Sequence, residues 1–94
     1  MYELRPATRF RRDVKRCRKR GWNLELLTVA LDLLSATGEL PERYGAHPLR
    51  GEFAGCLDAH IEGDWVLIFE VHEDAKVVVL RRTGTHQDVF RSYR

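Results

Sequence analysis

The chain has 94 residues, of which 44% are hydrophobic and 32% charged, and a formal net charge of +2. This length and composition are typical of one folded domain, so we expect a single domain over residues 1–94 and neither a disordered nor a membrane protein. No signal peptide and no stretch of roughly 18 apolar residues is evident, so we expect a cytoplasmic protein with no membrane partner. Cys17 and Cys56 have no metal-type spacing and are predicted to be reduced and buried.

Positive charge is concentrated at the N-terminal end of the chain. The first twenty residues contain nine basic and two acidic residues, a formal charge of +7, whereas the rest contain seven basic and twelve acidic residues, a charge of −5. Charges of one sign repel one another unless a polyanion is near, so this segment is predicted to bind nucleic acid, although a solvated helix face is the alternative. The residues expected to contact RNA here are Arg11, Arg12, Lys15 and Arg16.

The first forty residues predict a short strand followed by two helices. Residues 2–4 are predicted to form the strand. Helical spacing of apolar residues begins at Thr8, and Gly21 is a natural stop. Asn23 is a good N-cap for a second amphipathic helix that ends at Gly38. The short link between the helices predicts an antiparallel helical hairpin.

The second half of the chain predicts a loop, three strands and a short helix. Residues 39–53 contain four prolines and glycines and show neither helical nor strand periodicity, so a loop is expected. Residues 56–62 alternate as in a strand with one polar face, and residues 65–69 are apolar throughout, as in a central strand. A turn then leads to a third strand at 77–82, and Thr85 can cap a short helix over 86–90.

One of the four histidines is predicted to share a strand face with a carboxylate. His60 shares its predicted strand face with Asp58, and Asp64 follows at the turn. A carboxylate beside an imidazole raises its pKa and fixes its tautomer, which suits acid–base catalysis near neutral pH, whereas a solvent-facing polar strand is the alternative. His72 lies in a charged turn and is predicted to be a solvated loop residue.

His86 is predicted to occupy the first position of the last helix, with Phe90 on the same helix face. A helix N-terminus attracts phosphate, and Arg82 at the end of the preceding strand is expected to hold one there. The alternative is a frayed terminal turn in which Phe90 only packs on the sheet.

Three motifs occur in order along the second half of the chain and together resemble the YafQ-type toxins of the RelE/ParE superfamily. They are His47-Pro48-Leu49, the segment from Gly55 to Ile68 with Asp58-Ala59-His60 and Asp64-Trp65, and Arg82-Thr83-Gly84-Thr85-His86 with Phe90. The resemblance implies an α+β fold in which an N-terminal helical hairpin packs on a small twisted, mainly antiparallel β-sheet with a short C-terminal helix. The sequence departs from the family pattern at Leu57, Gly63 and Phe69.

The resemblance also implies a function. Such a toxin is a ribosome-dependent endoribonuclease that cleaves mRNA in the ribosomal A site, without metal or cofactor, and thereby inhibits translation. Its implied partners are the ribosome with its rRNA, mRNA, and a cognate antitoxin protein that silences it in a hetero-oligomer. The implied catalytic residues are His47, Asp58, His60, Asp64, His86 and Phe90. Two alternatives remain open: a metal-dependent nuclease that uses the histidines and aspartates as ligands, and a non-enzymatic ParE-like toxin or regulator.

Overall fold

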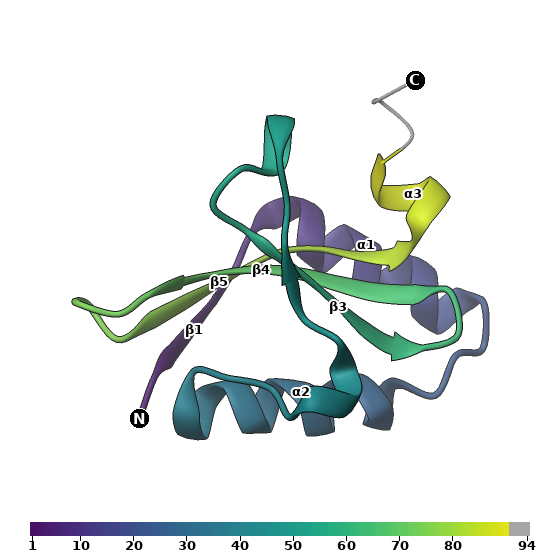
Figure 1. Cartoon of the computed structure of the whole chain (residues 1–94). Helices are drawn as coiled ribbons and strands as arrows, with labels where there is room; N and C mark the ends of the chain where they lie inside the picture. Colours follow the sequence, from purple (N-terminus) through teal and green to yellow (C-terminus); the bar gives the residue numbers. More distant parts are fainter. Residues whose placement is uncertain (91–94) are drawn as a thin grey trace.

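A computed structural model, which describes residues 1–90, shows a five-stranded mixed sheet with the strand order β1-β5-β4-β3-β2 (Figure 1). The strands are β1 (Glu3–Pro6), β2 (His47–Pro48), β3 (Leu57–Glu62), β4 (Trp65–His72) and β5 (Val77–Thr85). The helices are α1 (Thr8–Lys19), α2 (Leu24–Thr37) and α3 (His86–Phe90), with 3-10 turns η1 (Glu42–Tyr44) and η2 (Gly51–Phe53). The predicted α+β fold is confirmed.

The sheet is mainly antiparallel, as predicted, because β2, β3, β4 and β5 pair in that sense. The exception is β1, which pairs parallel with β5, so that Leu4 lies opposite Val78. A parallel pair needs a long connection, and here the intervening residues 7–76 contain both long helices and the strands β2, β3 and β4. No helix within residues 1–90 is long and apolar enough to cross a membrane.

Local signals place the ends of α2 where the sequence predicts them. The side chain of Asn23 accepts a hydrogen bond from the backbone N–H of Glu25, at 3.1 Å, and thus caps the N-terminus. Gly38 ends the helix with a φ of +76°, and a Cβ atom there would lie 2.5 Å from the ring of Tyr2. Glycine is therefore required both by the left-handed backbone and by the close approach of Tyr2.

The two faces of the sheet have separate apolar cores. On one face, α1 and α2 contribute Phe10 and Leu34 to a cluster that includes Leu67 and Phe69 of β4. The alternate residues of β4 belong to a second cluster, in which Val66 and Ile68 join Phe53 of η2 and Val89 of α3. Figure 1 shows α2 on one side of the sheet, with α3 and η2 on the other.

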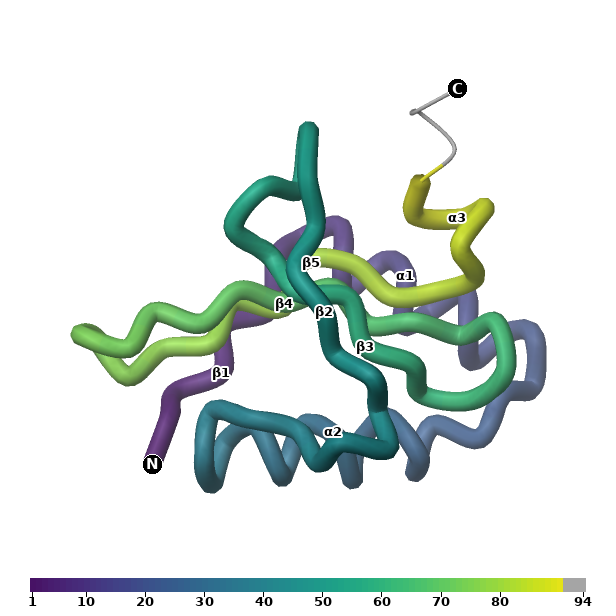
Figure 2. Tube along the Cα trace, in the orientation of Figure 1, coloured from purple at the N-terminus to yellow at the C-terminus, as the bar shows by residue number. Residues whose placement is uncertain are grey.

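The segment 39–53, predicted as a loop, contains two 3-10 turns and the two-residue strand β2. In β2, His47 lies opposite Asp58 and Pro48 opposite Leu57 at the edge of the sheet. Figure 2 shows this segment crossing in front of β3, from the side of α2 to the side of η2. Two residues are too few to show strand periodicity, so only the pairing with β3 reveals this strand.

A buried carboxylate attaches α1 to β5. Asp13 is 2% exposed and accepts hydrogen bonds from Nε of Arg82 at 2.7 Å and from the backbone N–H of Thr83 at 3.0 Å. A third donor is Arg16, whose Nη2 lies 2.7 Å from Oδ1. Since the pairing with β1 ends at Leu80, this side chain satisfies a backbone donor that β1 no longer reaches.

Candidate active site

The structure brings together all six residues that the sequence singles out for catalysis. Adjacent strands β2 and β3 supply His47, Asp58 and His60. The β3–β4 turn supplies Asp64, and α3 supplies His86 together with Phe90. The ring centroid of His60 lies 6.4 Å from that of His47 and 5.7 Å from that of His86. Three imidazoles and two carboxylates thus share one small region of the surface.

Asp64 holds His86 in one orientation. Its Oδ1 lies 2.5 Å from Nδ1 of His86 and 3.3 Å from the backbone nitrogen of the same residue. These hydrogen bonds keep the pKa of Asp64 below its usual value, so the carboxylate is ionised at neutral pH. An ionised carboxylate can only accept, so Nδ1 carries a proton and Nε2 is the nitrogen left for chemistry.

Asp58 is a buried carboxyl group between two imidazoles. It is 2% exposed, and its Oδ2 lies 3.7 Å from Nε2 of His47 and 3.7 Å from Nε2 of His86. Its Oδ1 is buried and accepts no hydrogen bond within residues 1–90. Burial raises the pKa of Asp58, although the charges of His86, His47 and His60 act in the opposite direction. Such an unsatisfied polar atom costs stability and often marks a functional site.

Phe90 adds an apolar surface beside the imidazoles. Its ring lies 5.9 Å from that of His86, with an interplanar angle of 23°. Phe53 from η2 and Phe90 are packed in a T-shape, with a centroid distance of 5.8 Å. An aromatic ring placed in this way next to an imidazole can stack on a nucleobase.

The basic residues separate into two groups. Arg11, Arg12 and Lys15 are exposed on α1, and we call them the basic surface. Arg16 is half-buried and pairs with Asp13. Arg82, which was expected to hold a phosphate, is 8% exposed, and its guanidinium is bound to Asp13. This ion pair was not predicted from the sequence, in which its only signal is one acidic residue inside a basic helix.

Metal binding was one of the alternatives left open by the sequence. Within residues 1–90, no three histidine, cysteine or acidic side chains are arranged to hold a metal ion. The nearest approach to such a group is Asp58 with His47 and His86, whose Nε2 atoms each lie 3.7 Å from one carboxylate oxygen. A transition metal bound there would require other side-chain positions than those of the structure.

Comparison with known proteins identifies the family. Residues 2–91 match the family model described as a bacterial toxin of type II toxin–antitoxin systems, YafQ. The mRNA interferase toxin YafQ of Escherichia coli strain K12 is 39% identical over 89 residues, which cover 94% of this chain and 95% of the relative.

Solved structures agree with this match. YafQ in the crystal structure of the E. coli DinJ–YafQ toxin–antitoxin complex has a TM-score of 0.83 and 36% identity, over 95% of this chain and 97% of that one. The crystal structure of a metal-bound toxin from Helicobacter pylori has a TM-score of 0.85 and 27% identity, over 96% of this chain and 100% of that one. The fold thus places the chain among small bacterial toxins. It belongs to the YafQ family of toxins of type II toxin–antitoxin systems.

The burial of Asp58 leads to a prediction about stability. Because its pKa is raised in the folded state, the ionised carboxylate is less stable there than in the unfolded chain. Asp58→Asn keeps the shape and removes the charge, so we expect the free energy of unfolding at pH 7 to rise by about 1 kcal/mol. This gain in stability should disappear as the pH falls through the pKa values that Asp58 has in the folded and in the unfolded chain. Below both values the wild-type carboxyl is protonated in both states.

This prediction is checked by urea unfolding of wild type and Asp58→Asn from pH 7 to pH 3. The control is Asp32→Asn, which removes a carboxylate from the exposed side of α2. A variant that is less stable than wild type at pH 7 would show that the carboxylate contributes favourable contacts that outweigh its burial.

Proposed function

We propose that this toxin is an mRNA interferase that cuts mRNA on the ribosome and inhibits translation, using acid–base catalysis by its histidine cluster. The observation that carries the proposal is the arrangement around His86, whose ring is held by Asp64 and faces the buried Asp58. The reaction class is that of the E. coli relatives, which are named as mRNA interferase toxins. Ribosome dependence and the roles of individual residues are part of the proposal.

The chemistry requires two proton transfers. The 2′-hydroxyl of the RNA loses a proton to a base and attacks the adjacent phosphorus, while the leaving 5′-oxygen takes a proton from an acid. The products are a 2′,3′-cyclic phosphate and a 5′-hydroxyl, and no oxidant or cofactor is consumed. In our proposal His47 and His86 exchange these protons through their Nε2 atoms, each of which lies 3.7 Å from Oδ2 of Asp58.

The remaining site residues support these two imidazoles. Asp58 lies 3.7 Å from each Nε2 and would stabilise whichever ring becomes positively charged during the reaction. The ring of His60 lies 6.4 Å from that of His47 and 5.7 Å from that of His86, and would contact the phosphate. Phe90 would stack on a base next to the scissile phosphate and align it with His86.

Two binding partners complete the proposal. The basic surface of α1 would bind phosphates of ribosomal RNA and so steer the toxin to the ribosome. A cognate antitoxin would keep the toxin silent, as the pairing of the E. coli relative with DinJ suggests. An acidic antitoxin segment complements the same basic surface, so ribosome and antitoxin would compete for it.

The central prediction concerns His86. His86→Ala should remain folded and should lose at least about 100-fold in the rate of mRNA cleavage, because a positioned general acid or base contributes that much. Cleavage is measured on programmed ribosomes by primer extension, and folding by circular dichroism. The matched control is His72→Ala in the β4–β5 hairpin, where the histidine is exposed and 3.4 Å from Glu70. Native cleavage by folded His86→Ala would disprove the assignment.

A second prediction is that the catalysis needs no transition metal. The proposed proton transfers use only side chains, so cleavage should survive dialysis of the toxin against a chelator before it is added to ribosomes that retain their magnesium. The structure of a metal-bound toxin from H. pylori makes this test necessary for the present chain. Loss of cleavage on dialysis, with recovery on adding zinc, manganese or copper, would replace the proposal by a metal-dependent mechanism.

A third prediction concerns the basic surface. Arg11→Gln combined with Lys15→Gln should weaken binding to ribosomes and lower the slope of log affinity against log salt by roughly one for each phosphate that is no longer bound. Sedimentation across a salt series measures both quantities. The matched control is Arg5→Gln combined with Lys76→Gln, which removes the same charge from the β1 side of the sheet. Equal affinity and slope for wild type and the α1 variant would reduce this surface to a solvated helix face.

A further inference from the structure

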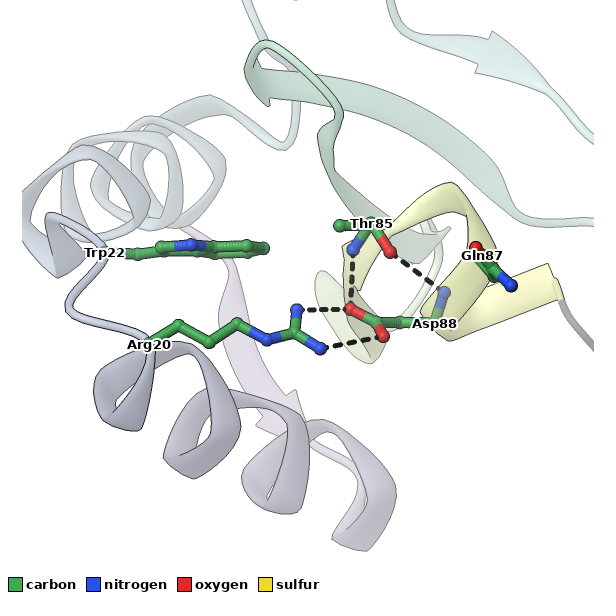
Figure 3. Close-up of a pocket in the computed structure, with 5 residues that line it drawn as sticks. All are labelled: Arg20, Trp22, Thr85, Gln87 and Asp88. Atoms are coloured by element: carbon green, nitrogen blue, oxygen red, sulfur yellow. Dashed lines mark hydrogen bonds and ion pairs between the residues drawn. The ribbon is translucent and has the colours of Figure 1, made fainter.

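The end of α1 is linked to α3 by an ion pair that the proposed chemistry does not include. Arg20 follows the last residue of α1, and its guanidinium extends to Asp88 on α3 (Figure 3). Nη1 lies 2.6 Å from Oδ2 of Asp88, and Nη2 lies 3.0 Å from Oδ1. Arg16 also lies near this carboxylate, with its Nε 3.9 Å from Oδ2 of Asp88. A bidentate pair of this kind fixes both distance and direction between its partners.

Asp88 is also part of the cap of α3. Its Oδ2 accepts a hydrogen bond from the backbone N–H of Thr85 at 2.9 Å, while Oγ1 of Thr85 accepts one from the N–H of Asp88 at 3.0 Å. This reciprocal capping arrangement surrounds His86, which lies directly after Thr85. A helix of five residues is too short to be stable without such contacts, so the position of His86 depends on what holds α3.

The surroundings favour this one arrangement of Asp88. Its Oδ2 lies only 2.8 Å from the place that a Cβ atom would occupy on Gly84, so the approach requires glycine. The hydrogen bonds from Arg20 are the main reason that the pKa of Asp88 is far below its usual value. The carboxylate is therefore ionised at neutral pH. On the other side, the guanidinium of Arg20 lies 5.1 Å above the ring of Trp22, which packs on Trp65 at 4.9 Å.

We propose that Arg20 and Asp88 are positioning residues that hold the His86 imidazole between Asp64 and Asp58. The bidentate pair ties α3 to α1, and the hydrogen bonds of Asp13 to Arg82 and Thr83 tie α1 to β5. The inference rests on the proposed function in that His86 is taken as the catalytic imidazole. A ring displaced by about 1 Å can cost up to about 100-fold in rate, so an ion pair remote from the RNA can affect the reaction.

The test compares Arg20→Gln with Arg20→Lys and with the control Lys19→Gln. All three act at the same end of α1, and Lys19 is exposed and bonded to no acidic side chain within residues 1–90. Arg20→Gln removes the ion pair but leaves the hydrogen bonds between Thr85 and Asp88 in place. Two readouts are used: kcat and KM for mRNA cleavage on ribosomes, and the ¹⁵N chemical shifts of the His86 ring in the free toxin.

We expect Arg20→Gln to lower kcat by roughly tenfold with KM nearly unchanged, and to shift the ring resonances of His86. Arg20→Lys, which keeps the charge, should recover part of both effects, and Lys19→Gln should leave kcat and the His86 shifts at their wild-type values. If Arg20 only stabilised the fold, Arg20→Gln would lower the unfolding midpoint. Under conditions in which the variant is folded, its kcat and His86 shifts would be native. If Arg20→Gln is too unstable to assay, Asp88→Asn removes the charge while keeping an oxygen for the cap.

The outcomes separate the two proposals. Native kcat and native His86 shifts in folded Arg20→Gln, with wild type active, would overturn the positioning role and leave the proposed function intact. If wild type does not cleave mRNA but the His86 resonances still respond to Arg20→Gln, the proposed function fails and the link between α1 and the His86 ring stands.

Discussion

The positions of α1 and α3 relative to the sheet depend on the interaction of the Asp13 carboxylate with β5. The carboxylate lies in the interior, where it binds the guanidinium of Arg82 and the backbone N–H of Thr83. Loss of this one group would leave a buried arginine without its counter-charge, which commonly costs several kcal/mol. It also fixes where α1 lies against β5. Because α1 is held there, its C-terminal end faces α3 and can bind Asp88.

The apolar core and the histidine cluster lie on different parts of the sheet. The face covered by α1 and α2 carries the larger apolar cluster, whereas the β2–β3 edge carries histidines around Asp58, whose Oδ1 accepts no hydrogen bond within residues 1–90. A buried, unsatisfied Asp58 is unfavourable for folding, and the apolar core makes it tolerable. Sites of this kind, where a local rule is broken and the rest of the fold is regular, are where function is expected.

The sequence predicts the elements whose signals are local. Asn23 and Gly38 mark the two ends of α2, and Thr85 marks the start of α3, because caps act within one helical turn. The alternation in β3 correctly places Asp58 and His60 on one face. The parallel pairing of β1 with β5, the strand β2 and the partner of Arg82 are not predictable in this way, because each depends on residues distant in sequence.

This difference between local and distant partners also changes the meaning of the charge asymmetry. Counted along the sequence, the first twenty residues carry a charge of +7. In the structure, Arg16 and Arg20 pair with carboxylates of the same molecule, and one of these, Asp88, lies far outside that segment. Only cations that are exposed and free of such pairs can release counterions when they meet a phosphate. The positive charge exposed on the outer side of α1 is therefore smaller than the sequence suggests, because the inner cations Arg16 and Arg20 are bound to Asp13 and Asp88.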